Sequence, residues 1–485
     1  MRLLLSLGFA LSMIVSAYGA QFTGPTDPSP DAYRVFLPSV YQRNNLGEDR
    51  VGKIPGSYVR RVNVPYFPNT FSLPETAVFW FGKVTPTENY ADVRMGYSDN
   101  ELFIRVAAFD QKLWYDSNPS PESLHAWDSV SLYLDLDGNQ GDGLPTRSYR
   151  FDGMLNWWED RANFQAAYRG GPDGWTKADI SFETKTGWRG NAPQDDKPDR
   201  GWTITYHVPF QSLGLAQAPQ PGEIWGLGVV LHDRDSANES PLEVKFWPET
   251  MVENDPGTWG QLAFGLPTYI PPAASTGGSI TIRDRLDGAT VTDGMVGGGT
   301  TCGAGIDFWT EWGDKAYPGE EFINVQNQED VADWPCYSKF YLRFPLNNVP
   351  QGKVILSAKL VLHQFGNSGG GEWGAPPRSL IQAFTVAEDW DPAKLTWNSA
   401  PLALENVSRT WVDGITDFPG WPGIPYEWEV SKAAAQAYAT GQPLRLALYS
   451  ADAAYHTGKY FVSSVTEDWN KTARPTLVIE WGNPQ

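Results

Sequence analysis

Alternation of apolar and polar residues dominates this chain. In Asp128–Leu136, Val130, Leu132, Leu134 and Leu136 fall on one face and mostly polar residues on the other, which is the period of a half-buried β-strand. The same period recurs in segments 101–110, 201–210, 224–233, 339–346, 357–365, 443–450 and 474–481. We expect the alternate apolar residues of these segments to form the core.

Helical periodicity is rare. Ser431–Thr440 predicts one short helix, with Ser431 as its cap and Gly441 at its end, and Pro209–Leu215 predicts one helical turn. Segment 266–278 is rich in Pro, Ser, Thr and Gly, which is typical of a linker. The sequence therefore predicts an all-β fold of two tandem antiparallel β-sandwich domains joined by this linker, with the helix in the second domain.

The N-terminus indicates the cellular location that we expect for this protein. Residues 1–20 contain one Arg, an apolar run and then small residues, which predicts a secretory signal peptide, and the run is too short for a membrane span. A Pro-rich lead (21–45), the first sandwich (46–265), the linker (266–278) and the second sandwich (279–485) follow. We expect a secreted, extracellular or cell-surface protein that does not insert into a membrane.

Charge and composition limit the classes of ligand that this chain is expected to bind. The 485 residues carry a net charge of −20 and include 22 Trp, 21 Tyr and 23 Phe. A strongly acidic chain repels phosphate backbones, so we expect no nucleic-acid binding. Sugar rings pack their CH faces on exposed aromatic rings. The rings near predicted turns or strand ends are the candidate sugar platform, although core packing is the alternative for each: Trp80, Trp114, Tyr115, Trp157, Trp158 and Trp175.

An acidic loop follows the first of these strands. Asp135, Asp137, Asn139 and Asp142 are spaced by glycines and other short residues, and oxygen ligands of this kind suit calcium. We predict a structural calcium site there, with a solvated turn as the alternative. Segment 232–239, HDRDSANE, is a weaker candidate of the same kind.

Other chemistry finds less support in the sequence. Cys302 and Cys336 predict a disulfide in an oxidising compartment. The five histidines form no zinc motif, no residue spacing singles out a haem ligand pair, and acidic pairs in so acidic a chain do not identify a glycosidase. We therefore expect neither haem nor catalysis, and a glycoside hydrolase remains the enzymatic alternative.

Within residues 76–265, five segments follow one another in the order DVRMGYSDNELFIRVAAFD, WDSVSLYLDLDGNQGDG, GWTITYHVPFQSLGL, PGEIWGLGVVLHDRD and PGTWGQLAFG. This order gives the first region a resemblance to carbohydrate-binding module family 9 and the related DOMON-like sandwiches. It implies an antiparallel sandwich that binds sugar between exposed aromatics, often with structural calcium, whereas some DOMON relatives bind haem.

The second region contains, in order, KFYLRFPLNNVPQGKVILSAKLVLHQF, EDWDPAKLTWNSAPL, YEWEVSKAAAQAYATGQPLRLAL and RPTLVIEW. This order gives it a resemblance to the DNRLRE-type sandwich, from which the insert 297–335 departs. It implies a domain of secreted or surface proteins, some of which bind polysaccharide. Together the two regions predict an exported, non-catalytic polysaccharide-binding protein, with a glycoside hydrolase or a structural surface or matrix protein as the alternatives.

Overall fold

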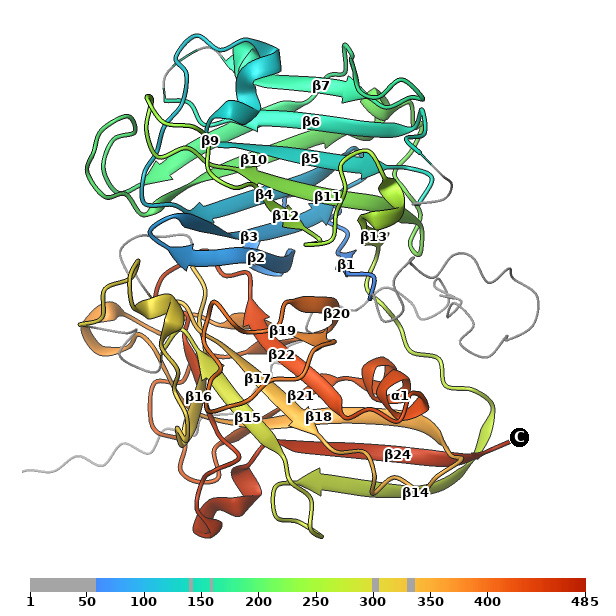
Figure 1. The fold of residues 1–485 in the computed structure, drawn as a ribbon. Helices are drawn as coiled ribbons and strands as arrows, with labels where there is room; N and C mark the ends of the chain where they lie inside the picture. Colours follow the sequence, from blue (N-terminus) through green and yellow to red (C-terminus); the bar gives the residue numbers. More distant parts are fainter. Residues whose placement is uncertain (1–57, 139–142, 158, 160, 299–304, 329–335) are drawn as a thin grey trace, which may run out of the picture.

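The computed structural model describes residues 58–138, 143–157, 159, 161–298, 305–328 and 336–485. Two β-sandwiches stack on each other, the first drawn blue to green and the second yellow to red (Figure 1). The predicted fold class, an all-β chain of antiparallel sandwiches with one short α-helix in the second, is confirmed. No helix in these ranges is long and apolar enough to cross a membrane.

The first sandwich consists of two facing sheets. One sheet has the order β2 (Ala77–Thr85), β3 (Glu88–Tyr97), β4 (Glu101–Phe109), β10 (Gly201–Pro209) and β9 (Glu183–Arg189). The other has the order β1 (Arg61–Val64), β13 (Gly260–Phe264), β11 (Ile224–His232), β5 (Ser129–Asp135), β6 (Ser148–Met154), β7 (Gln165–Arg169) and β8 (Thr176–Lys177), and β12 (Lys245–Trp247) also pairs with β11.

The second sandwich repeats this two-layer plan. Its first sheet has the order β14 (Ala274–Arg283), β24 (Thr476–Pro484), β18 (Val354–Asn367), β23 (Lys459–Val462) and β16 (Phe322–Val325), and β21 (Ile424–Glu429) pairs with β18. Its second sheet has the order β15 (Thr292–Val296), β17 (Lys339–Phe344), β22 (Leu444–Ser450), β19 (Ser379–Val386) and β20 (Ala403–Val412). Helix α1 (Ser431–Ala439) contacts β18 and β22.

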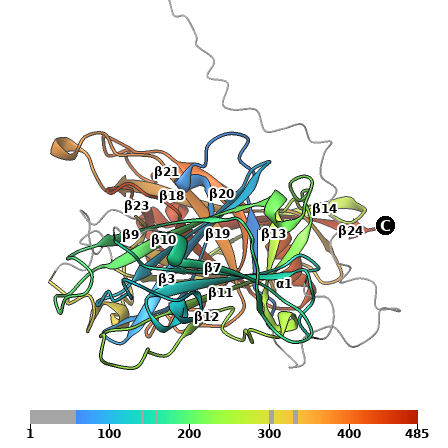
Figure 2. The same ribbon diagram turned by 90° about the horizontal axis from the view of Figure 1, so that it is seen from above.

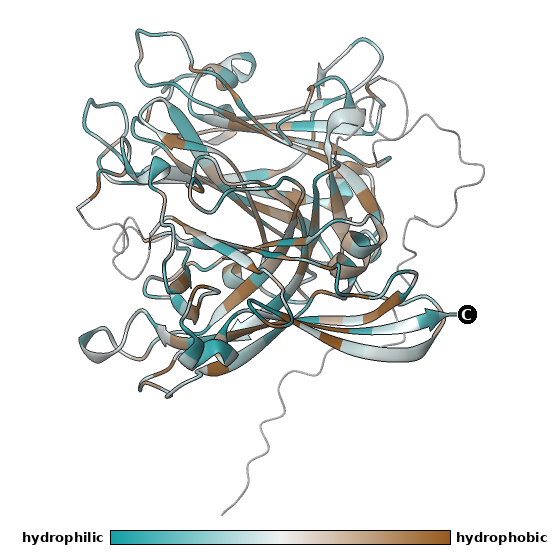
Figure 3. Cartoon of the chain, turned by 60° about the horizontal axis from the view of Figure 1, so that its bottom comes forward, coloured by the Kyte–Doolittle hydropathy of each residue, from teal (hydrophilic) through white to brown (hydrophobic). Residues whose placement is uncertain are grey.

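The predicted inward faces form the two cores. The alternate apolar residues of β4, β5, β10 and β11 lie together in the first core, and those of β17, β18, β22 and β24 lie in the second. Figure 3 shows the corresponding brown, hydrophobic segments along the strands of both sandwiches. The period-2 pattern therefore assigned these faces correctly, because the pleat alone sends alternate side chains to opposite sides of a strand.

Two local expectations need correction. Ser431 is the first residue of α1 rather than its cap, because Val430 holds the cap position and the Ser431 hydroxyl instead accepts a hydrogen bond from Ala358 N at 2.6 Å. Strand β14 begins at Ala274, inside segment 266–278, because its residues pair with β24.

Some sequence-predicted residues lie outside the described ranges, namely Cys302, Asn139, Asp142, Trp158 and residues 1–57. Pairing of Cys302 with the buried Cys336 therefore stays a prediction.

Strand β1 joins the sandwiches into one 13-stranded sheet. It pairs in parallel with β13 along four residues, and with β20 of the second sandwich through Arg61 and Glu405. Viewed from above, the strands of the first sandwich lie over those of the second (Figure 2). The two sandwiches are therefore joined through a sheet as well as through the chain.

Polar side chains reinforce this junction. Arg60 is buried and forms ion pairs with Glu249 of the first sandwich and with Glu388 of the second, the latter at 3.2 Å. Asn63 N donates to Asn406 Oδ1 at 2.7 Å, and Asn406 Nδ2 donates to Asn63 O at 2.9 Å. Reciprocal amide bonds of this kind leave few buried polar groups without a partner.

An apolar cluster also joins the two sandwiches. In β2, Ala77, Phe79 and Phe81 face the first core, whereas Val78 and Trp80 face the second sandwich. The ring of Trp80 meets Phe384 at 5.1 Å and Tyr449 at 5.5 Å, edge to face in both pairs. Both faces of β2 are therefore buried, and Trp80, 1% exposed, does not offer a ring to a ligand.

Lys339 lies within this interface with no exposure to solvent. Its ammonium lies 3.9 Å from the ring centre of Trp397 and 4.2 Å from that of Trp80, and it donates to the Tyr90 hydroxyl at 3.0 Å. The Tyr90 hydroxyl in turn donates to Asp92 at 2.7 Å. Burial lowers the pKa of Lys339 well below its usual value, and the nearby Asp92 carboxylate offsets part of that effect.

We predict that Trp80→Ala lowers the free energy of unfolding by about 3–5 kcal/mol, because it leaves a cavity between the sandwiches. Urea denaturation measures the change. Trp373→Ala is the control: Trp373 is 63% exposed, and its removal should change stability by no more than about 0.5 kcal/mol. Equal stability of the two variants would contradict the double burial of β2.

Candidate functional site

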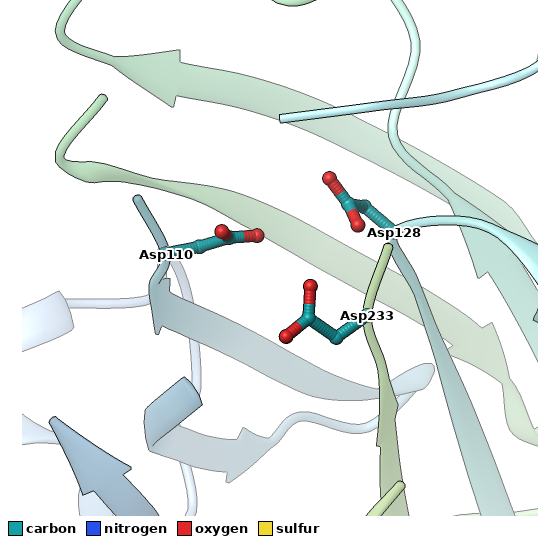
Figure 4. Close-up of side chains that lie close together, drawn as sticks. All are labelled: Asp110, Asp128 and Asp233. Carbon is teal, nitrogen blue, oxygen red and sulfur yellow. The ribbon is translucent and has the colours of Figure 1, made fainter. Parts of the chain in front are cut away.

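Three aspartates meet at one end of the first sandwich. Asp110 directly follows β4, Asp128 directly precedes β5, and Asp233 directly follows β11. Because β5 and β11 pair with Ser129 opposite His232, the flanking Asp128 and Asp233 lie side by side. Strand β4 belongs to the facing sheet, so Asp110 approaches from across the sandwich (Figure 4). We call these three residues the aspartate cluster.

The carboxylates of the aspartate cluster are buried and converge. One oxygen from each lies within 4.8 Å of the others, and Figure 4 shows the three groups pointing toward one another. Asp110 Oδ2 and Asp233 Oδ1 are buried and have no hydrogen-bond partner among the described residues. Uncompensated carboxylates are costly to bury, so this arrangement favours either protonation or a bound cation.

Backbone amides hold part of the aspartate cluster. Asp128 accepts from Trp114 N at 2.7 Å and from Arg234 N at 2.9 Å, and Asp110 accepts from Lys112 N at 2.9 Å. Asp128 thereby fixes two loops, of which one carries Trp114. Because these hydrogen bonds join the loops to the cluster, a change of charge at the cluster affects the position of Trp114.

The electrostatics of the cluster follow from burial. Desolvation raises the pKa of Asp110 and of Asp128 well above the usual carboxyl value, and the charge of neighbouring aspartates adds to it. The same two causes raise the pKa of Asp233 to about 8. Hydrogen bonds from backbone N–H groups, and from the Asn89 side chain in the case of Asp233, lower these pKa values only in part.

The residues present fit a hard divalent cation. Two oxygens bound to one calcium ion at about 2.4 Å lie at most about 4.8 Å apart, and the three carboxylate oxygens lie within that limit. An all-oxygen donor set favours calcium, magnesium or manganese over zinc or copper. Calcium would take its remaining ligands from carbonyl groups and water.

Three partly exposed tryptophans belong to the first sandwich, and one of them, Trp114, is bonded to the aspartate cluster through its backbone. Trp114, Trp157 and Trp188 are each half-buried, and we call them the aromatic rim. Trp157 and Trp188 contact edge to face at 5.1 Å. Glu159 joins the segment of Trp114 and Tyr115 to that of Trp157. Its carboxylate accepts hydrogen bonds from the Tyr115 hydroxyl at 2.9 Å and from Trp157 N at 3.0 Å. Two aromatic loops therefore meet around one carboxylate.

The sequence-predicted aromatic residues separate into groups. Trp114 and Trp157 lie in the rim, and the buried Tyr115 supports it. Trp175 lies elsewhere, against Tyr133 at 5.5 Å and stacked on Trp259 at 6.4 Å. Trp80 is in the interface between the sandwiches, and Trp158 lies outside the described residues. Trp188 was not among the predicted residues; it lies in β9 opposite Trp202 of β10 and packs against the first core, although its ring stays partly exposed.

The sequence-predicted calcium loop is only partly described. Asp135 is buried and accepts from Asp137 N and from the Ser148 hydroxyl, both at 3.3 Å. Asp137 forms an ion pair with Arg147 at 2.7 Å. Asn139 and Asp142 lie outside the described residues, so a calcium site in this loop stays a prediction.

Sequence reasoning missed the aspartate cluster. Asp110, Asp128 and Asp233 all stood in segments recognised as strands, and Asp233 belongs to the weaker acidic segment 232–239. The available signal was an Asp at the end of each of three strands. That these three ends meet depends on strand order and direction, which periodicity does not reveal.

The similarity of this chain to known proteins is low. No protein-family model matches the sequence, and no curated protein matches it. A solved carbohydrate-binding module of family 9 from Caldicellulosiruptor kristjanssonii, in complex with cellotriose, shares 17% identity over 43% of this chain and 95% of its own, with a TM-score of 0.31. The corresponding glucose complex shares 18% identity over 44% of this chain and 100% of its own, with a TM-score of 0.30.

At such TM-scores and identities, these matches say nothing about the ligand of this chain. None of the matches supports the DNRLRE-type resemblance of the second region.

We predict that stability depends on pH through the aspartate cluster. In chelator, unfolded aspartates titrate near about 3.9, whereas Asp233 titrates at about 8 in the folded state. The folded protein holds more protons between these values, so stability is greatest at the acidic end and falls as pH rises toward 8, by up to about 1.4 kcal/mol per pH unit for one such group.

Urea denaturation at several pH values, with chelator or with calcium, measures this effect. Calcium should reverse the loss at pH 8 and have little effect at pH 4, where protons occupy the carboxylates. A calcium effect of equal size at both pH values would contradict the assignment.

Proposed function

We propose that this protein is an exported, non-catalytic glycan-binding protein whose first sandwich binds a neutral polysaccharide at the aromatic rim. In this proposal a calcium ion held by Asp110, Asp128 and Asp233 orders the loop that presents Trp114. The observation that carries the proposal is the hydrogen bond from Trp114 N to Asp128 at 2.7 Å, which joins the aspartate cluster to the rim.

The chemistry of the rim supports a sugar ligand. Half-buried indole rings offer flat apolar faces, and the pyranose ring has apolar CH faces of similar size. Glu159 supplies a carboxylate close to these rings, which suits the hydroxyl groups around a sugar. The net charge of −20 disfavours anionic polysaccharides, so a neutral chain fits better.

The role of calcium follows from the charge of the cluster. Without a cation, the raised pKa of Asp233 keeps protons on the cluster at neutral pH. As these protons leave at higher pH, the converging carboxylates repel each other and weaken the contacts that hold the loops after β4 and β11. A bound divalent ion would neutralise most of this charge and retain both loops. Calcium would therefore act on the position of Trp114 and would not itself contact the glycan.

We predict that Asp110→Asn combined with Asp233→Asn abolishes calcium binding, measured by isothermal titration calorimetry, and removes the rise of melting temperature on calcium addition. The amide keeps the shape of the side chain but removes two charges. Asp137→Ala is the matched control in the predicted acidic loop and should leave calcium binding intact. Loss of calcium binding in Asp137→Ala alone would instead place the ion in the loop.

We predict that Trp114→Ala combined with Trp157→Ala weakens binding to neutral polysaccharides about tenfold, since each ring carries a large share of the contact. Affinity electrophoresis in gels containing xyloglucan, galactomannan or mixed-linkage β-glucan measures retardation. Chelator should weaken the wild type and leave the double variant unchanged. Unaltered retardation of the double variant would refute a site at the aromatic rim.

A further inference from the structure

The second sandwich exposes a group of large aromatic side chains. Trp469 is 64% exposed, Phe418 60% and Trp421 48%. Scattered exposed rings are common on proteins, whereas a contiguous apolar patch usually marks an interaction site. These rings are contiguous, because Trp421 contacts Phe418 at 5.2 Å and Trp469 at 5.3 Å. We call Phe418, Trp421 and Trp469 the aromatic patch.

The aromatic patch rests on the outer face of the six-stranded sheet. Trp421 also contacts Phe365 of β18 at 5.7 Å, and Phe365 contacts Phe322 of β16 at 6.3 Å. The next residue of β16, Ile323, points to the second core, so Phe322 points to the opposite, outer side. Two half-buried rings on the sheet thus continue the exposed patch inward.

The loops that carry the patch are held in place. Ile415 N donates to Asn367 Oδ1 at 2.6 Å, and Asp413 N donates to the Tyr426 hydroxyl at 3.1 Å. Gly423 has a φ of +100°, and a side chain there would meet Gln364 O at 2.5 Å, so the loop lies directly on β18. A ligand surface that is ordered beforehand loses less entropy on binding.

The other side of the patch is held by a buried arginine. Arg474, which is buried, donates to Thr466 O at 2.9 Å and to Asp468 Oδ1 at 2.6 Å. These bonds anchor the segment that carries Trp469, so the exposed indole stands on a rigid base.

Charge indicates which partner the patch fits. The acidic residue next to Trp469, Asp468, pairs with Arg474 at 2.6 Å and with Arg285 at 3.1 Å. This local charge is balanced within the protein and does not call for a charged ligand. The net charge of −20 opposes anionic polymers and anionic membranes. A partner with apolar faces, many hydroxyls and no charge fits both the exposed aromatic rings and the acidic net charge of the protein.

We propose that the aromatic patch is a second glycan-binding site, at which a neutral polysaccharide chain lies across the rings of Trp421 and Trp469. This site stands apart from the aspartate cluster and goes beyond the proposed function of the first sandwich. The sheet and the apolar interface join the sandwiches into one body, so the two sites keep a constant separation. Simultaneous binding of one polymer would raise the overall affinity through effective concentration.

The test uses the full chain and starts from the variant Trp114→Ala with Trp157→Ala. Affinity electrophoresis against the same neutral polysaccharides, with insoluble cellulose pull-down as a second probe, should show residual binding that chelator does not change. Adding Trp421→Ala and Trp469→Ala should lower this residual binding at least about tenfold. Adding Trp373→Ala instead, which removes an equally exposed indole outside the patch, should leave it unchanged. Unaltered melting temperatures show that the variants remain folded.

The outcomes separate this site from the first. Residual binding that survives Trp421→Ala with Trp469→Ala, or the absence of residual binding, overturns the second site and leaves the rim proposal intact. Full binding by the rim variant, lost only on changing the patch, supports the second site and overturns the first. A wild-type dimer that becomes monomeric in Trp421→Ala with Trp469→Ala, measured by sedimentation with unchanged glycan binding, assigns the patch to self-association and also overturns the proposal.

Discussion

The outer face of strands β2, β3 and β4 is buried against the second sandwich, and the rest of the molecule depends on this contact. Trp80, Tyr90 and Phe109 form one apolar cluster with rings of the second sandwich, among them Trp397 and Tyr449. Apolar burial on both faces of one sheet favours a single body over two mobile modules. Any ligand sites on the two sandwiches therefore have a set distance and orientation.

Buried charge is handled in two different ways in this protein. In the interface, Asp92 accepts hydrogen bonds from Tyr90, Tyr449 and Asn327, at 2.7 Å, 3.0 Å and 3.0 Å, and Lys339 lies nearby. Side chains thus satisfy this carboxylate within the protein. The hydrogen bonds to Asp110 and Asp128 come from backbone N–H groups, and the aspartate cluster keeps two buried oxygens without partners among the described residues. The first arrangement stabilises an interface, and the second is suited to an added cation.

Several parts of this architecture were predictable from residue order. Leu132, Ile204 and Leu446 face their cores as the period of two requires, because the pleat depends only on the local backbone. The burial of Trp80 also had a local signal: β2 begins AVFWF, with no polar residue to mark a solvent face, as is typical of a strand covered on both sides. This local signal favours a buried Trp80 over a ring exposed near a loop.

Both candidate sites depend on chain segments that are distant in sequence. Asp110 and Asp233 are separated by more than half of the first sandwich, and Trp421 and Trp469 belong to different loops of the second. Local patterning establishes the fold class, the faces of the strands and the chemical character of each segment. Which strand ends meet, and which aromatic rings stay in water, is settled by long-range strand pairing and by the packing of one sandwich on the other, since these contacts join residues with no local relationship.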